Sequence, residues 1–257
     1  MTAGAAGSRY GTREWFDGEY ARGLEDPWGL TWRPSQRLRY LRVLGAIQAI
    51  EGPLHRIMDV GCATGEFTRL ISQRLGSARV VLGVDFSEAA IERARSKASG
   101  ATFAAESVFA LGERYRRQFD LVACLEVLYY VEARERAAAL RSLREAVRDD
   151  GYFVVSSFVG SPPYFSPGEL LRLVATEFDV IRWELLHLRA VSFIERLGTR
   201  LDVLVAGRGR ARGPGIGRKL GTLPWSMVVA IERWSRCLGP VLASHVLVLA
   251  QARGRPA

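Results

Sequence analysis

Residues 56–71 read RIMDVGCATGEFTRLI, and this stretch decides the fold. The short apolar run Ile57–Val60 has the length of a buried strand, and Glu66–Leu75 has the apolar spacing of an amphipathic helix. Between them lies a turn built from small residues, where backbone N–H groups can approach a ligand closely. The stretch therefore predicts the first strand, turn and helix of a nucleotide-binding α/β sheet.

The same alternation continues along the chain, with short apolar strands between amphipathic helices. The expected further strands are Arg79–Val84, Ala101–Ala105, Phe119–Cys124, Gly151–Ser157, Val180–Leu188 and His245–Ala250, and the expected helices are Arg37–Ile50, one capped by Ser87, Ala133–Arg148 and Pro167–Thr176. Crossover helices must cover both faces of a parallel sheet. An α/β domain with a mostly parallel sheet is therefore expected.

We predict a single domain over residues 1–257 with four parts. Residues 1–50 form an N-terminal helical cap, 51–189 the core, 190–243 a helical insertion, and 244–257 the last strand and tail. The insertion contains apolar helical stretches near Ser192–Val205 and Pro224–Leu238 on either side of a glycine- and arginine-rich loop, RGRARGPGIGRK. Two readings of that loop are open, a cap over the acceptor pocket and a solvated linker.

Composition restricts the class of protein. Apolar residues make up 48% of the chain, which is enough for a sizeable core. Charged residues make up 25%, the usual share for a globular protein, so a disordered chain is excluded. No apolar stretch is long enough to span a membrane, and the N-terminus lacks the apolar segment of a secretory signal. The three cysteines, Cys62, Cys124 and Cys237, are too widely spaced for a disulfide framework or a zinc site. We expect a cytoplasmic protein.

The turn D-x-G-x-A-x-G differs from the G-x-G-x-x-G pattern of dinucleotide-binding proteins. Glu66 at the start of the following helix would repel a pyrophosphate, whereas an ammonium and carboxylate, as in the methionine part of S-adenosylmethionine, fit better. The next strand ends in Asp85, which could accept hydrogen bonds from ribose hydroxyls or cap the following helix. Glu106 follows the third strand and could meet an adenine amino group or lie in solvent.

Four segments in order, DVGCATG, VDFS, FDLVACLEVLYYV and DDGYFVVSS, resemble the successive motifs of class I S-adenosylmethionine-dependent methyltransferases. The resemblance covers roughly residues 10–190 and the last strand. A closer resemblance, to the NodS-like methyltransferases that act on an amino sugar, rests on EVLYYV (Glu126–Val131) and on EDPWGLTWRPSQRLRY, which contains a D-P-W element followed by an S-x-x-x-R helix. The insertion at 190–240 has no counterpart in that family.

The resemblance implies a Rossmann-like, seven-stranded sheet with an antiparallel last strand, and S-adenosylmethionine as the cofactor at the carboxyl ends of the strands. Asp59 and Gly61 would then line the methionine moiety, Asp85 the ribose, and Glu106 with Ser107 the adenine edge. The full expected cofactor-binding set is Trp28, Asp59, Gly61, Ala63, Gly65, Asp85, Phe86, Glu106, Ser107 and Glu126.

Methyl transfer from a sulfonium mainly requires alignment of donor and acceptor and removal of a proton from the nucleophile. Glu126 follows the fourth strand and could be the general base or a cofactor contact. Tyr129 could orient the acceptor or pack in the core, and His187 could be catalytic or structural. His245 and His55 are expected away from the site. No cluster has metal-ligand spacing, so no metal is expected.

The acceptor is predicted to be a small molecule, a sugar or a glycosylated metabolite, methylated on a hydroxyl or an amine. The net charge of +9 favours RNA as an alternative, but aromatic residues for base stacking are not concentrated with the arginines, so a nucleic acid is disfavoured. The apolar stretch Pro224–Leu242 beside the arginine-rich loop keeps a lipid-linked acceptor and peripheral membrane contact open. The sequence does not predict the oligomeric state.

Overall fold

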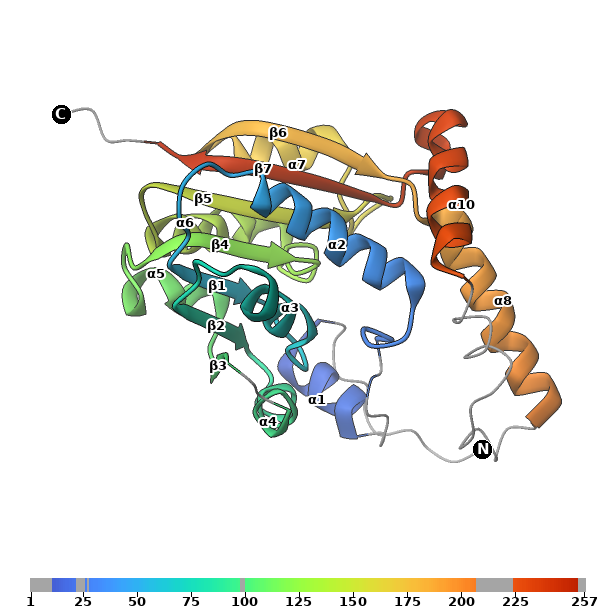
Figure 1. The fold of residues 1–257 in the computed structure, drawn as a ribbon. Helices are drawn as coiled ribbons and strands as arrows, with labels where there is room; N and C mark the ends of the chain where they lie inside the picture. Colours follow the sequence, from blue (N-terminus) through green and yellow to red (C-terminus); the bar gives the residue numbers. More distant parts are fainter. Residues whose placement is uncertain (1–10, 22–25, 27, 98–99, 207–223, 254–257) are drawn as a thin grey trace.

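The computed structural model describes residues 11–21, 26, 28–97, 100–206 and 224–253. Seven strands form one sheet in the order β3-β2-β1-β4-β5-β7-β6 (Figure 1). Their bounds are β1 Arg56–Val60, β2 Val80–Asp85, β3 Thr102–Ala105, β4 Phe119–Leu125, β5 Val147–Phe158, β6 Phe178–Leu186 and β7 His245–Ala252. The pairs among β1–β5 are parallel, and β7 lies antiparallel between β5 and β6. The expected Rossmann-like sheet with its antiparallel last strand is confirmed.

Helices cover both faces of the sheet. The α-helices are α1 Arg13–Ala21, α2 Pro34–Gln48, α3 Glu66–Arg74, α4 Glu88–Ser96, α5 Leu111–Arg114, α6 Arg136–Ala146, α7 Pro167–Val174, α8 Arg189–Ala206 and α10 Trp225–Cys237, and short 3-10 turns lie at Val108–Ala110 (η1), Ala133–Glu135 (η2) and Gly239–Leu242 (η3). One apolar cluster joins the sheet to α5, α6 and α7, and a second joins the opposite face to α2, α3, α8 and α10. The arrangement matches the expected crossover helices.

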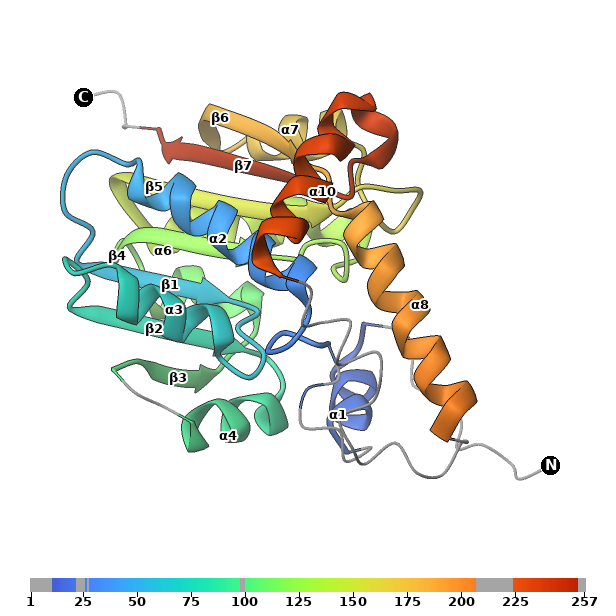
Figure 2. The same cartoon turned by 45° about the vertical axis from the view of Figure 1, so that its right-hand side comes forward.

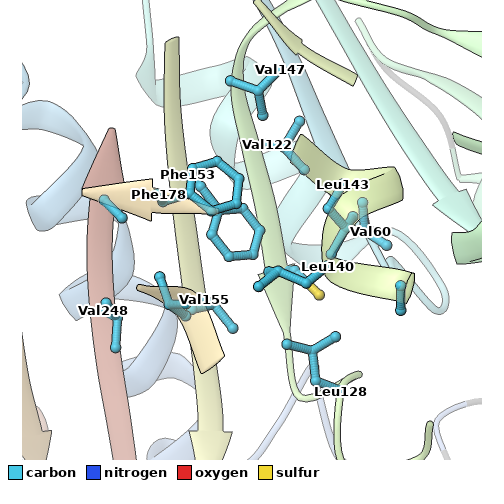
Figure 3. Close-up of a cluster of buried hydrophobic side chains, with 14 of the residues drawn as sticks. Val60, Val122, Leu128, Leu140, Leu143, Val147, Phe153, Val155, Phe178 and Val248 are labelled. Atoms are coloured by element: carbon cyan, nitrogen blue, oxygen red, sulfur yellow. The ribbon is translucent and has the colours of Figure 1, made fainter. Parts of the chain in front are cut away.

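The core is densest around the two central strands. Every residue of β4 is buried, and β1 is buried beyond its first residue. Figure 3 shows Leu140 and Leu143 of α6 packing toward the strands beside Val122 and Val155, with the rings of Phe153 and Phe178 stacked 4.6 Å apart. Such strands, covered on both faces, explain the uninterrupted apolar runs in the sequence.

Some element boundaries differ from the expected ones. The helix expected at Ala133–Arg148 begins as a 3-10 turn and ends at Ala146, because the chain is extended from Val147 onward and already pairs with Phe119. The poorly patterned stretch before β4 contains η1 and α5. Ser87 does cap α4, since its hydroxyl accepts a hydrogen bond from the Ala90 N–H at 3.2 Å.

Parallel strands β1, β2 and β4 point their carboxyl ends toward the side of the molecule where α1, α8 and α10 lie (Figures 1 and 2). The N-terminal helices and the late insertion, far apart in sequence, therefore meet at the edge of the sheet where ligands bind in this class of fold.

Candidate active site

A cavity of about 1440 Å³ opens at the carboxyl ends of the strands. Its walls come from the turns after β1, β2, β3 and β4, from α1 and α2, and from α8, α10 and the start of β7. A typical small-molecule pocket is roughly 300–1,000 Å³, so this cavity has room for a cofactor and a second molecule.

At one end, the turn after β1 is shaped by Gly61 and Asp85. Gly61 has a φ of +73°, and its N–H donates to the Val84 carbonyl at 2.8 Å. The Asp85 carboxylate accepts from the N–H groups of Ala63 at 2.9 Å and Ser87 at 3.0 Å. Burial raises the pKa of Asp85 against these hydrogen bonds. Asp85 therefore ties the first turn to the second and lines the cavity, while Ser87 does the capping.

Asp59 lies beneath this turn and also lines the cavity. It is buried, and one of its oxygens accepts a hydrogen bond from the Thr68 hydroxyl at 2.6 Å. Burial raises the pKa of Asp59 to about 7, although the bond from Thr68 opposes the shift. Gly65 does not line the cavity, and a Cβ atom there would lie 2.7 Å from the Phe103 ring. Its role is close packing of the turn against β3.

Polar and aromatic side chains complete this end of the cavity. Glu106 lines it and pairs with Arg114 at 2.7 Å, with only 12% of its side chain exposed, so it is not a solvated loop carboxylate. Ser107, Phe86 and Trp28 also line it. Aromatic rings from α1 and the segment after it cover the opening: the Phe16 ring lies 5.2 Å from Phe86 and 5.8 Å from Trp28.

At the other end, Glu126 lies directly after β4 with a φ of +61°, a strained conformation for a residue with a side chain. Its carboxylate is 2.9 Å from Arg39, accepts from the Ser156 hydroxyl at 2.7 Å, and lies 3.8 Å from Nε2 of His245. Burial alone would raise the pKa of Glu126, but a protonated His245, the Arg39 guanidinium and the hydrogen bond from Ser156 act against it and hold that pKa below its ordinary value. The carboxylate is therefore ionised and held by partners on three elements.

The structure corrects the expectations for two histidines. His187 follows β6 and is buried, but it does not line the cavity. His245 does line it, because β7 runs antiparallel to β5 and its first residue therefore pairs with Phe158 at the carboxyl end of that strand. Burial lowers the pKa of His245 to about 4 against the attraction of Glu126, so its imidazole is neutral at neutral pH.

Arg39 was not singled out from the sequence, although it ends the S-x-x-x-R pattern in α2. Its guanidinium is almost fully buried in the cavity wall, where it pairs with the Glu126 carboxylate at 2.9 Å. The S-x-x-x-R pattern includes Arg39, but the pattern alone does not predict that Arg39 of α2 pairs with Glu126 at the end of β4.

The walls around Glu126 are largely aromatic and come partly from the insertion. Tyr129 lines the cavity, and burial raises the pKa of its hydroxyl well above the ordinary value, so the hydroxyl is protonated. Its ring lies 5.0 Å from Tyr164. Helices α8 and α10 add Phe193, Trp234 and Leu238. The arginine-rich loop between these helices, with Arg208, Arg210 and Arg212, lies outside the described residues.

Within the described part of the chain, no group of three or more histidine, cysteine, aspartate or glutamate side chains is placed to hold a metal ion. The described helices also include none that is long and apolar enough to cross a membrane.

Comparison with known proteins identifies the family. The family model described as "Methyltransferase domain" matches residues 52–192. Nodulation protein S of Rhizobium tropici is 28% identical over 135 residues, 52% of this chain and 55% of that protein. A ubiquinone biosynthesis O-methyltransferase of Pseudomonas aeruginosa is 30% identical over 111 residues, 42% of this chain and 46% of that protein. The chain thus spans about half the length of these curated relatives.

The fold has solved counterparts as well. The crystal structure of the N-methyltransferase NodS from Bradyrhizobium japonicum WM9 with S-adenosyl-L-homocysteine superposes with a TM-score of 0.61 at 16% identity, covering 93% of this chain and 97% of that one. The family match agrees with the sheet topology and with the turn after β1. Together they confirm the resemblance to class I S-adenosylmethionine-dependent methyltransferases that the motifs indicate. The chain belongs to the methyltransferase-domain family, within the class I S-adenosylmethionine-dependent methyltransferases.

Proposed function

We propose that this protein transfers a methyl group from S-adenosylmethionine to a hydroxyl or an amine of a small-molecule acceptor, a sugar or a glycosylated metabolite. The observation that carries the proposal is the shared cavity, in which the Asp59–Gly61–Asp85 end is continuous with the end around Glu126 and His245. Donor and acceptor must be held in line in one enclosed space, and this cavity has the size and position for both.

The residues at the first end fit the cofactor. Half-buried Asp85, next to the open backbone of the Gly61 turn, offers a carboxylate to two ribose hydroxyls, and buried Asp59 offers one to an ammonium group. Glu106 and Ser107 would contact the adenine edge, and Trp28 would cover the cofactor. When bound, S-adenosylmethionine supplies a methyl group activated by its sulfonium.

At the second end, the chain itself must orient the acceptor and take its proton. Glu126 is ionised, and Arg39 and Ser156 both contact its Oε1 atom, an arrangement suited to positioning rather than to taking up a proton. The imidazole of His245, in the same wall, is neutral and is the proposed proton acceptor for an alcohol, although its lowered pKa makes it a weak base. Tyr129, Phe158 and Tyr164 would stack on a ring of the acceptor.

A second acceptor class, a lipid-linked molecule, is favoured by one observation. Phe193, Trp234 and Leu238 line the cavity and are at the same time strongly exposed, so the mouth is apolar on its outer side.

Incubation with methyl-labelled S-adenosylmethionine tests the activity. The purified protein is offered amino-sugar oligomers with a free amine, matched N-acetylated oligomers, and phenolic glycosides. We expect label transfer to at least one sugar class, with the N-acetylated oligomers separating amine from hydroxyl methylation. The proposal is wrong if S-adenosylhomocysteine does not bind in calorimetry, and its sugar acceptor is wrong if the cofactor binds but only lipid-linked substrates accept label.

A further inference from the structure

The two helices of the insertion and the turn after them expose a group of large apolar side chains. Phe193 and Leu197 lie on α8, Met227, Trp234 and Leu238 on α10 and at its end, and Val241 on η3; we call these six residues the apolar rim. We propose that the apolar rim docks on the surface of an anionic lipid bilayer and holds the mouth of the cavity against it. The part that concerns the cavity mouth rests on the proposed function.

The rim is an organised surface. Phe193 and Leu197 are four residues apart on α8, and Trp234 follows Met227 by seven residues on α10, spacings that place each pair on one helix face. Phe193 is 63% exposed, Trp234 60% and Val241 76%. Helices α8 and α10 contact each other and lie together on the ligand-binding side of the sheet in both views (Figures 1 and 2).

The charges of these helices favour an anionic partner. Both of their described acidic side chains are buried: Glu195 accepts from the N–H and hydroxyl of Ser35, and Glu232 pairs with Arg42 and Arg236. Among the described side chains of α8 and α10, the exposed charges are therefore those of arginines, Arg196 and Arg233 included. Apolar and aromatic side chains flanked by arginines are typical of helices that lie in the interface of a bilayer.

The rim is continuous with the cavity. Phe193, Trp234 and Leu238 belong both to the exposed rim and to the cavity wall, and Arg196 lies beside them in that wall. A bilayer seated on the rim would therefore face the acceptor end of the site. An acceptor carrying an acyl or prenyl chain could then enter the cavity while that chain stays in the bilayer. If the acceptor had to leave the bilayer first, the apolar surface of the chain would be exposed to water, which is unfavourable.

Two other partners fit the surface less well. Four of the six side chains, Leu197, Met227, Leu238 and Val241, are aliphatic or thioether groups that cannot stack on bases, so a single-stranded RNA would use only part of the rim. A symmetric contact with a second copy would bring the exposed arginines of both copies together. The described parts of these helices offer no exposed acidic side chains to pair with them, so the like charges would repel each other.

Co-sedimentation with vesicles tests the proposal on the full chain. We expect binding to phosphatidylglycerol–phosphatidylcholine vesicles and at least tenfold weaker binding to vesicles of pure phosphatidylcholine. Raising the salt concentration roughly tenfold, from about 50 mM to about 500 mM, should weaken binding to the anionic vesicles, because salt screens the arginine charges. The double variant Phe193→Ser, Trp234→Ser should lose at least tenfold in vesicle affinity.

Matched controls use exposed residues elsewhere. Ile181 and Trp183 on β6 are also exposed, so Ile181→Ser, Trp183→Ser removes similar apolar area without touching the rim and should bind vesicles like the unmodified chain. Arg196→Glu, Arg233→Glu should weaken binding to anionic vesicles, whereas Arg116→Glu, Arg141→Glu, both exposed and distant in sequence from the insertion, should change it less than twofold.

Calorimetry with S-adenosylhomocysteine on every variant separates the two proposals. Retained cofactor affinity with lost vesicle binding supports docking through the rim, and absent cofactor affinity in the unmodified chain counts against the proposed function alone. Docking is overturned if no vesicle binds, or if rim and control variants lose binding equally. It is also overturned if the rim variants instead abolish retention on RNA or a dimer seen in gel filtration while leaving vesicle binding unchanged.

Discussion

At the scale of single residues, Asp85 is the most informative position at the cofactor end. It joins the turns after β1 and β2 through two backbone N–H groups and faces the cavity. Asp85→Ala should weaken S-adenosylhomocysteine binding by roughly 1–3 kcal/mol, because it removes a charged hydrogen-bond acceptor from the cavity wall. Calorimetry measures the loss, and Asp85→Asn, which keeps the shape and part of the hydrogen bonding, should lose less. Equal affinity in all three proteins would remove Asp85 from the site.

We propose different roles for Glu126 and His245 at the end of the cavity expected to hold the acceptor. Glu126→Gln leaves the buried Arg39 charge without its carboxylate and should raise the KM for the acceptor. His245→Asn removes the neutral imidazole and should lower kcat for a hydroxyl acceptor by roughly 10²–10⁴-fold. Steady-state kinetics on both variants, with cofactor affinity measured alongside, distinguish the two. An unchanged kcat in His245→Asn would leave proton removal to solvent.

At the scale of elements, α7 contains a complete capping box. The Ser166 hydroxyl accepts from the Glu169 N–H at 3.3 Å, and the Glu169 carboxylate accepts from the Ser166 N–H at 2.7 Å. Ser166→Ala should lower the free energy of unfolding by about 1 kcal/mol, the usual cost of losing an N-cap. Urea denaturation measures the change, and the exposed Ser161→Ala serves as control. Cofactor affinity should be unaltered, since α7 is remote from the first end of the cavity.

At the scale of the whole molecule, two buried groups give opposite pH dependences. His245 has a pKa of about 4 in the fold and 6.5 when unfolded, so its contribution to stability is present above pH 6.5 and lost as the pH falls toward 4. Asp59 has a pKa of about 7 in the fold and 3.8 when unfolded, so its contribution is present below pH 3.8 and lost as the pH rises through 7.

The two slopes oppose each other between pH 4 and 6.5. Asp59→Asn should therefore make the free energy of unfolding fall more steeply as the pH is lowered, and His245→Gln should make it fall less steeply or rise. Urea denaturation at several pH values across this window measures both slopes. Parallel pH profiles for the two variants would show that these groups are not held in the states described.

The sequence by itself determined the sheet and the group of side chains around the Gly61 turn, the end of the cavity that we propose holds the cofactor. Local spacing suffices there: a strand, a turn of small residues and a helix are contiguous, and Asp85 and Glu106 each follow a strand whose carboxyl end must reach the same edge. Gly61, Ala63 and Asp85 accordingly lie together. Helix ends such as Ala146 were less predictable, because strand pairing overrode the local apolar pattern.

Only the tertiary structure decided the acceptor end. Arg39, Glu126 and His245 are distant in sequence and meet because α2 packs on one face of the sheet and β7 lies antiparallel between β5 and β6. The antiparallel direction of β7, which the family resemblance already implied, brings its first residue to the carboxyl edge, so His245 lies in the cavity wall. His187 follows β6, the edge strand on the far side of β7, and does not line the cavity. Spacing along the chain carries no record of which distant strand lies beside which, because the order is selected by packing of the whole sheet.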